Sequence, residues 1–151
     1  SALQVLHFTG GQEASELVRR AYHEANITAV VREFEPQMQY AWAAADVALA
    51  RSGASTIAEA VAFGVPAIFV PYPHAKDAHQ DKNAEYIATN VGGGVWFCEK
   101  TLDVPTLTAA LERLFFEPQR IQMKAALAKA GQEMQTRHFS DLVIDYIETK
   151  T

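Results

Sequence analysis

The sequence has little of several features that would place it in a functional class. Cys98 is the single cysteine in 151 residues, which excludes a disulfide framework and a zinc site built from cysteines. No apolar run approaches the roughly 20 residues of a transmembrane helix, and no signal-peptide pattern opens the chain. The net charge of −5 argues against non-specific binding of nucleic acid. We therefore expect a soluble protein of a reducing, cytoplasmic compartment.

Several well-known catalytic and phosphate-binding motifs are also absent. The Thr9-Gly10-Gly11 turn lacks the glycine spacing of the Gly-x-Gly-x-x-Gly loop, and no Walker motif or Gly-x-Ser-x-Gly elbow occurs. His74, Asp77 and His79 are metal-ligand types, but their spacing matches no zinc pattern. We therefore expect no metal and no other cofactor. Either the first βα unit of a doubly wound fold is missing here, or the fold is not a dinucleotide-binding one of the usual kind.

The pattern of apolar residues predicts an α/β fold. Short apolar strands alternate with amphipathic helices, as in βαβ units with a parallel sheet. The predicted strands cover residues 3–8, 27–31, 47–50, 67–70 and 95–97. Predicted helices cover residues 13–24, 52–63, 78–89, 107–116, 118–130 and 139–149, and a further helix begins at Pro36. We expect a single domain over residues 1–151, a Rossmann-like three-layer sandwich that binds its ligand at the carboxyl ends of the strands.

The most informative segment runs from Arg51 to Glu59. Its small residues form a turn that a ligand can approach closely, and the following helix start offers unpaired N–H groups to an anion. Glu59 is long enough to accept hydrogen bonds from a vicinal diol. These parts suit a nucleotide diphosphate that carries a ribose. The alternatives are an N-cap formed by Ser52 or Ser55, and a Glu59 that simply faces solvent near the helix N-terminus.

Several motifs in the same order and spacing resemble the MurG family of bacterial glycosyltransferases. The resemblance extends from about Val5 to Leu114. The matching segments are Val-Arg-Glu-Phe-Glu-Pro-Gln-Met at 31–38 with Tyr40, Trp42 and Asp46; Arg51-Ser-Gly-Ala with Thr56 and Glu59; Gly64-Val-Pro-Ala-Ile-Phe-Val-Pro; and His79-Gln80 with Asn83-Ala84. His7-Phe-Thr-Gly10 resembles the family's His-Gln-x-Gly turn, with Phe8 in place of glutamine.

The resemblance implies a role in donor binding for individual residues. By it, Glu59 holds the ribose hydroxyls of uridine diphosphate. The other implied roles are backbone N–H groups of Ser52, Gly53 and Ala54 near the diphosphate, Arg51 paired with a phosphate, Phe34, Glu35 and Met38 around the uracil, and His79, Gln80 and Asn83 at the donor sugar. Other interpretations stay open: Arg51 as a brace for a neighbouring loop, Phe34 as a core residue, His79 and Gln80 as a helix start facing water, and Asn83 as a loop anchor.

The resemblance also implies an enzyme with the GT-B architecture, in which two Rossmann-like domains face a cleft. This chain would be most of the C-terminal half, which binds UDP-N-acetylglucosamine for inverting transfer of N-acetylglucosamine to lipid I in peptidoglycan synthesis. The acceptor-binding half and the general base would lie outside it, so we name no catalytic residue and expect the isolated chain to be inactive. The full enzyme would be peripheral to the cytoplasmic face of the cell membrane.

Two other functions remain open from the sequence. The chain resembles the donor-binding part of other GT-B transferases, such as a split eukaryotic-type subunit that acts on a lipid-linked sugar with a membrane-bound partner. A nucleotide-binding module without catalysis is the alternative from a different class.

Overall fold

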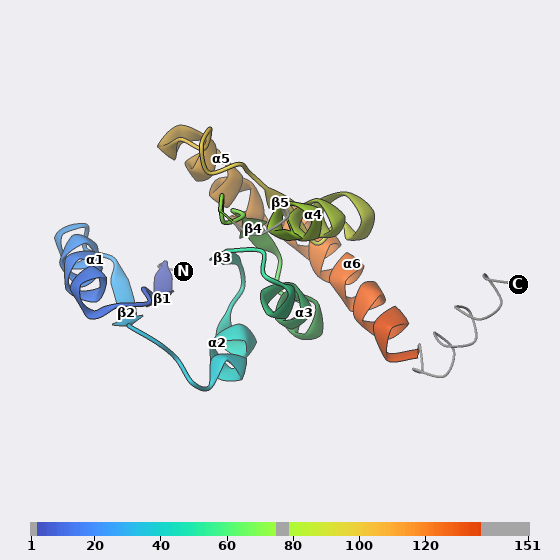
Figure 1. Ribbon diagram of the computed structural model, residues 1–151, viewed down its shortest axis with the longest axis horizontal. Coiled ribbons are helices and arrows are strands. Elements are labelled where there is room, and N and C mark those ends of the chain that lie inside the picture. The colour runs from blue at the N-terminus through green and yellow to red at the C-terminus, as the bar shows by residue number, and fades with distance from the viewer. Residues whose placement is uncertain (1–2, 75–78, 137–151) are drawn as a thin grey trace, which may run out of the picture. The chain divides into compact units, whose positions relative to one another are not determined.

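The computed structural model describes residues 3–74 and 79–136, with side chains described up to residue 134. The chain divides into two compact units, Ser1–Ala44 and Ala45–Thr151, and Figure 1 shows the helices and strands of both. Each unit contains parallel strands joined by helices, which confirms the predicted α/β class. The single domain over the whole chain stays a prediction.

The first unit is a βαβ arrangement followed by a short helix. Strand β1 (Gln4–Phe8) pairs in parallel with β2 (Thr28–Arg32), and α1 (Gln12–Glu24) connects them. The register runs from Gln4 opposite Thr28 to Phe8 opposite Arg32. Buried Ser15 fastens the turn that begins α1, because its hydroxyl bonds to Thr9 Oγ1 at 2.5 Å and donates to the Gly11 carbonyl at 3.0 Å. The unit ends with α2 (Met38–Ala44).

The second unit contains a three-stranded parallel sheet in the order β3-β4-β5. These strands are β3 (Ala48–Ala50), β4 (Ala67–Phe69) and β5 (Gly94–Trp96). Helix α3 (Ala54–Phe63) connects β3 to β4. Helix α4 (His79–Glu85) and the π-helical turn η2 (Tyr86–Val91) precede β5. Helices α5 (Val104–Phe115) and α6 (Glu117–Thr136) follow, and Figure 1 shows α6 running beside the sheet.

Strand β4 lies in the core of this unit and packs against α5 and α6. Every residue of β4 is buried, as expected for a central strand of a parallel sheet. Ile68 of β4 packs with Leu114 of α5 and Met123 of α6. Burying side chains of this size stabilises the fold by about 2 kcal/mol each. The ends of the three strands, where the candidate site lies, therefore rest on a packed core.

The predicted helices differ from the observed ones mainly at their ends. Gly64 ends α3 as predicted: it has a left-handed φ of 63°, and its N–H donates to the Val61 carbonyl. The start is at Ala54 rather than Ser52, because Gly53 has an extended backbone with ψ 154°. The predicted helix at 78–89 begins at His79 and changes to π-helix at Tyr86. The helix predicted at 139–149 lies outside the described residues.

One finding bears on the membrane. Within residues 3–74 and 79–136, no helix combines the length and the apolarity that crossing a bilayer requires.

Candidate donor-binding site

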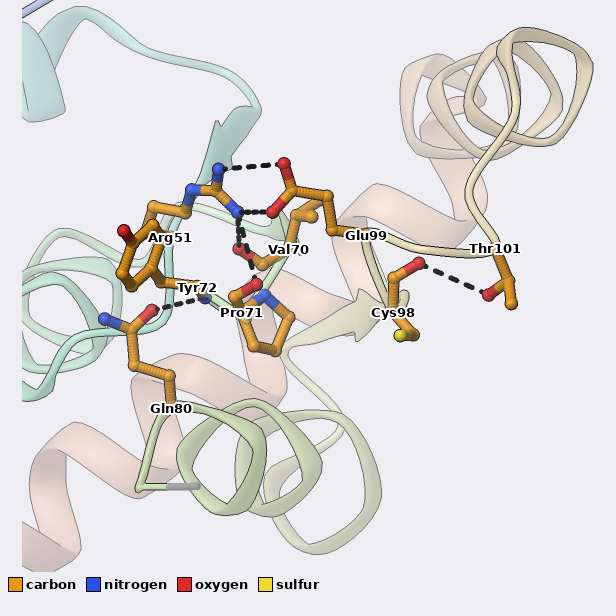
Figure 2. Close-up of polar contacts among 8 residues, drawn as sticks. All are labelled: Arg51, Val70, Pro71, Tyr72, Gln80, Cys98, Glu99 and Thr101. Atoms are coloured by element: carbon orange, nitrogen blue, oxygen red, sulfur yellow. Dashed lines mark hydrogen bonds and ion pairs between the residues drawn. The ribbon is translucent and has the colours of Figure 1, made fainter. Parts of the chain in front are cut away.

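The candidate site lies at the edge of the second unit where β3, β4 and β5 end. Since the three strands are parallel, the residues after each of them meet at the same edge. Arg51 and Ser52 follow β3, Val70 to His74 follow β4, and Phe97 to Glu99 follow β5. Figure 2 shows residues of all three segments in contact, with the segment after β4 contributing backbone carbonyls. The predicted location at the carboxyl ends of the strands therefore contains an organised polar cluster.

Arg51 joins the ends of all three strands. Its Nη1 donates to the carbonyl oxygens of Val70 and Pro71, both at 3.2 Å, and to Glu99 Oε2 at 2.8 Å. Its Nη2 donates to Glu99 Oε1 at 3.3 Å, so the carboxylate is bound by both nitrogens. The guanidinium also lies 5.6 Å from the centre of the Tyr72 ring. This arrangement is the loop brace that the sequence left open as an alternative to phosphate binding.

Ser52, Gln80 and Asn83, three of the predicted donor-binding residues, contact one another. The Ser52 hydroxyl donates to the Gln80 carbonyl at 2.8 Å, and Asn83 Nδ2 donates to the Ser52 carbonyl at 3.0 Å. Gln80 Oε1 accepts from the Tyr72 N–H at 2.9 Å. Asn83 thus anchors the turn before α3, which was one of its two expected roles. The start of α4 is fixed against the start of α3.

The N-terminus of α3 is not capped by Ser52, so the capping interpretation of that residue is wrong. Its hydroxyl is directed to Gln80 instead, and the cap position belongs to Gly53, which has no side chain that accepts a hydrogen bond. Ser55 lies inside the first turn rather than at the cap. The first-turn N–H groups, including that of Ala54, and the positive end of the helix dipole can therefore serve an anion.

Glu59 and His79 lie on the two helices that border this turn. Glu59 is half-buried near the middle of α3, while Ile57, Ala60 and Val61 form the buried side of that helix. Glu59 as a residue is thus neither enclosed in the core nor fully exposed to water. His79 is the first residue of α4 and is exposed.

The predicted uracil-contacting residues Phe34, Glu35 and Met38 belong to the first unit. Phe34 is 74% exposed, so its interpretation as a core residue is wrong. Glu35 pairs with Arg32, and its Oε1 accepts from the Gln37 N–H at 3.0 Å. Met38 is half-buried at the start of α2. Their role at the uracil stays a prediction.

Sequence reasoning missed two residues of the cluster, Tyr72 and Glu99. Both come shortly after a strand, which is the position that a parallel sheet directs to the ligand-binding edge. Glu99 stands in a turn in which the Cys98 carbonyl accepts from the N–H groups of Thr101 and Leu102, both at 3.1 Å. Cys98 itself is exposed. The position of Glu99 after the last strand was the available signal.

The Arg51–Glu99 pair gives a pH dependence with a definite sign. The hydrogen bond from Arg51 lowers the pKa of Glu99 below its ordinary 4.5, against an opposing effect of desolvation, and the charges of Arg51 and His74 lower it further. A carboxyl whose pKa is lower in the folded state stabilises the fold above its unfolded pKa and loses this effect as pH falls through the folded pKa. Glu99→Gln should therefore have a slightly lower urea midpoint than wild type at about pH 6, and this small difference should shrink as the pH falls through the pKa of Glu99. A difference that does not change with pH would contradict this assignment.

The described residues do not assemble a metal site. No three histidine, cysteine or carboxylate side chains within residues 3–74 and 79–136 lie close enough together to hold an ion. His74 and His79 are both exposed, and Asp77, the third residue of the loop considered from the sequence, lies outside the described part of the chain.

The chain matches the model of the glycosyltransferase family 28 C-terminal domain over residues 1–142. It belongs to this family. Among curated relatives, it is 40% identical over 151 residues to a protein of Protochlamydia amoebophila and 36% identical over 149 residues to one of Geobacter sulfurreducens. Both are called UDP-N-acetylglucosamine--N-acetylmuramyl-(pentapeptide) pyrophosphoryl-undecaprenol N-acetylglucosamine transferase. The match covers 99% of this chain and 40% of either relative.

A solved structure supports the same membership in family 28. The crystal structure of Acinetobacter baumannii MurG superposes with a TM-score of 0.76 at 29% identity, over 88% of this chain and 40% of that one. The likeness confirms the predicted resemblance to MurG and the Rossmann-like fold of a GT-B C-terminal domain. The chain spans about two fifths of the length of these family 28 proteins.

Proposed function

We propose that this chain is the donor-binding part of an enzyme that transfers N-acetylglucosamine from UDP-N-acetylglucosamine to lipid I, a lipid-linked sugar acceptor. Two relatives whose names state this transfer, and a family match over most of the chain, support the assignment. Acceptor binding and the general base would belong to the remainder of the longer enzyme. This enzyme would act in peptidoglycan synthesis at the cytoplasmic face of the membrane, as a peripheral protein.

The observation that carries the proposal is the polar cluster at the start of α3. Ser52, Gln80 and Asn83 fix a glycine-capped helix N-terminus at the edge of the sheet, with a half-buried glutamate, Glu59, near the middle of the same helix. A diphosphate is suited to the N–H groups and dipole of that helix start. Glu59 would then accept hydrogen bonds from the ribose hydroxyls, and Gln80 can both donate to and accept from a sugar hydroxyl.

These residues would assist an inverting displacement. The acceptor hydroxyl attacks the anomeric carbon of N-acetylglucosamine, the bond from that carbon to the diphosphate oxygen breaks, and uridine diphosphate leaves. The hydroxyl proton passes to a base outside this chain. The α3 N-terminus would stabilise the negative charge that develops on the leaving diphosphate, because a helix N-terminus offers fixed N–H groups and a positive dipole to such a charge. The α4 start would orient the sugar for in-line attack.

Calorimetric titration of the chain with nucleotides tests the proposal. We expect uridine diphosphate and UDP-N-acetylglucosamine to bind, and adenosine diphosphate and thymidine diphosphate to bind at least about ten-fold more weakly, a discrimination of about 1.4 kcal/mol. Equal affinity for all of these nucleotides would indicate a general anion site. No binding of either uridine ligand would refute donor binding by this chain.

Gly53→Ala separates binding from folding at the proposed diphosphate site. Among the described residues, a Cβ on Gly53 would meet only Thr56 Oγ1, at 3.9 Å, and the φ of −62° suits any residue, so we expect an unchanged melting temperature. The added methyl group would stand where a phosphate approaches the backbone, and loss of one charge-assisted hydrogen bond corresponds to about ten-fold weaker binding of uridine diphosphate. Titration of the variant checks the expected loss of affinity, and thermal unfolding of the same sample checks the expected melting temperature. Unchanged affinity for uridine diphosphate would show that no phosphate approaches the backbone closely at Gly53.

A further inference from the structure

A continuous set of contacts connects Glu99 to Gln80, across three strand ends. Glu99 binds both terminal nitrogens of Arg51, and Arg51 binds the carbonyl oxygens of Val70 and Pro71. The next N–H along the chain, that of Tyr72, donates to the side chain of Gln80 at 2.9 Å. Figure 2 shows this sequence of contacts from one end to the other. We call it the Glu99–Gln80 strap.

We propose that Glu99 is a positioning residue for the sugar of the donor. It holds the Arg51 guanidinium in place, the guanidinium fixes the backbone at Pro71, and this backbone sets the position of the Gln80 side chain. The inference rests on the proposed function, since it assigns Gln80 to the sugar. Glu99 itself does not touch the ligand.

The geometry of Arg51 favours a brace over a direct phosphate ligand. A guanidinium offers five N–H donors in a rigid planar fork. Nη1 and Nη2 together serve two backbone carbonyls and both oxygens of one carboxylate. A diphosphate at Arg51 would compete with the Glu99 carboxylate, with which the arginine already forms a bidentate ion pair. The anion-binding role at this edge therefore falls to the α3 N-terminus.

The Arg51–Glu99 pair is too exposed to contribute much to the stability of the fold. The side chains of Arg51 and Glu99 are 46% and 44% exposed, and pairs of this kind contribute little to global stability. The pair joins the segment after β3 to the segment after β5, which are far apart in the sequence. We therefore expect it to fix the position of these two segments at the edge of the sheet. Fixing the loop before a ligand arrives lowers the entropy that must be lost on binding. We therefore expect Glu99 to influence sugar binding more than folding.

The first test compares two ligands on Glu99→Gln, which keeps the shape of the side chain and removes its charge. Titration should show about five-fold weaker binding of UDP-N-acetylglucosamine, as expected for loss of about one hydrogen bond, while uridine diphosphate stays within about two-fold. Glu112→Gln is the matched control, because it makes the same change at an exposed position of α5 that is not one of the strap residues. It should leave both affinities unchanged.

Three results would overturn the positioning role. Equal weakening of both ligands would indicate a general structural effect. Tighter binding of uridine diphosphate would show that Glu99 withholds Arg51 from the phosphates. Wild-type affinity for both ligands would show that the strap does not reach the sugar.

A second test needs no ligand. Amide hydrogen exchange at Tyr72 reports on the bond from its N–H to Gln80, which closes the strap. We expect faster exchange in Glu99→Gln and in Arg51→Lys, no further increase in the double variant, and no change in Glu112→Gln. The double variant matters because two residues that act through one contact do not have additive effects. Wild-type exchange at Tyr72 in Glu99→Gln would overturn the inference.

The two tests fail in distinguishable ways. A wild-type chain that binds neither uridine ligand refutes the proposed function, and the exchange measurement still decides whether Glu99 fixes the Tyr72–Gln80 contact. A wild-type chain that binds both, with Glu99→Gln indistinguishable from it, refutes only the role of Glu99.

Discussion

Gly94→Ala should destabilise the chain by about 3 kcal/mol, which corresponds to a melting temperature lower by about 10 °C. Gly94 begins β5 and pairs with Ala67 of β4. A Cβ built on it would lie 2.4 Å from the Ala67 carbonyl oxygen and 3.2 Å from Phe69 Cε2. The first of these atoms is backbone in the buried central strand, so it cannot move aside alone. The two strands would have to separate, with loss of packing in the core.

Gly64→Ala is the control for this prediction. Its φ of 63° is unfavourable for alanine, but no atom of residues 3–74 and 79–136 lies within 4 Å of the added Cβ. We expect a cost of about 1 kcal/mol, from backbone strain alone. Urea unfolding of the two variants, with the same slope against denaturant, gives the comparison directly. A Gly94→Ala variant no less stable than Gly64→Ala would mean that β4 and β5 do not approach as closely as described.

Glu59→Ala should abolish the preference of the chain for ribose over deoxyribose. In the proposed complex this carboxylate accepts hydrogen bonds from both ribose hydroxyls. Two charge-assisted bonds of about 1.5 kcal/mol each correspond to about 100-fold weaker binding of uridine diphosphate. Deoxyuridine diphosphate lacks the 2′-hydroxyl and should bind wild type about ten-fold more weakly than uridine diphosphate does.

The comparison between the two nucleotides makes this test specific. In Glu59→Ala both should bind with similar affinity, because the group that distinguishes them is gone. Glu112→Gln changes a charge elsewhere in the same unit and should keep the wild-type preference. If Glu59→Ala retains that preference, the carboxylate does not contact the ribose, and the proposed orientation of the donor must be abandoned.

Much of the fold followed from the apolar pattern, since five strands and the helices between them occur close to their predicted positions. Apolar runs such as Ala67–Phe69 determine burial directly, and Gly64 marks a helix end through its own backbone preference. The failures concern tertiary surroundings. Phe34 was open to interpretation as a core residue, yet it is 74% exposed. A one-dimensional pattern does not state which face of a segment the rest of the chain covers.

The site was predictable in its members but not in its connections. Arg51, Ser52, Gln80 and Asn83 were selected from motifs, and the structure brings them to one edge. The partnership of Arg51 with Glu99 could not be derived, because it joins residues 48 positions apart through the order of three strands. The same strand order decides that the hydroxyl of Ser52 bonds to α4 rather than to its own helix. Local rules favour a cap at that position, and a tertiary contact replaces it.

The exposed thiol of Cys98 has a practical consequence. It is the single cysteine of the sequence and directly precedes Glu99, so a maleimide fluorophore would attach at one defined place without mutagenesis. A dye there would stand beside the carboxylate that holds Arg51. Changes in its emission during addition of nucleotide sugars would follow rearrangement at this edge of the sheet in real time, in the unaltered sequence.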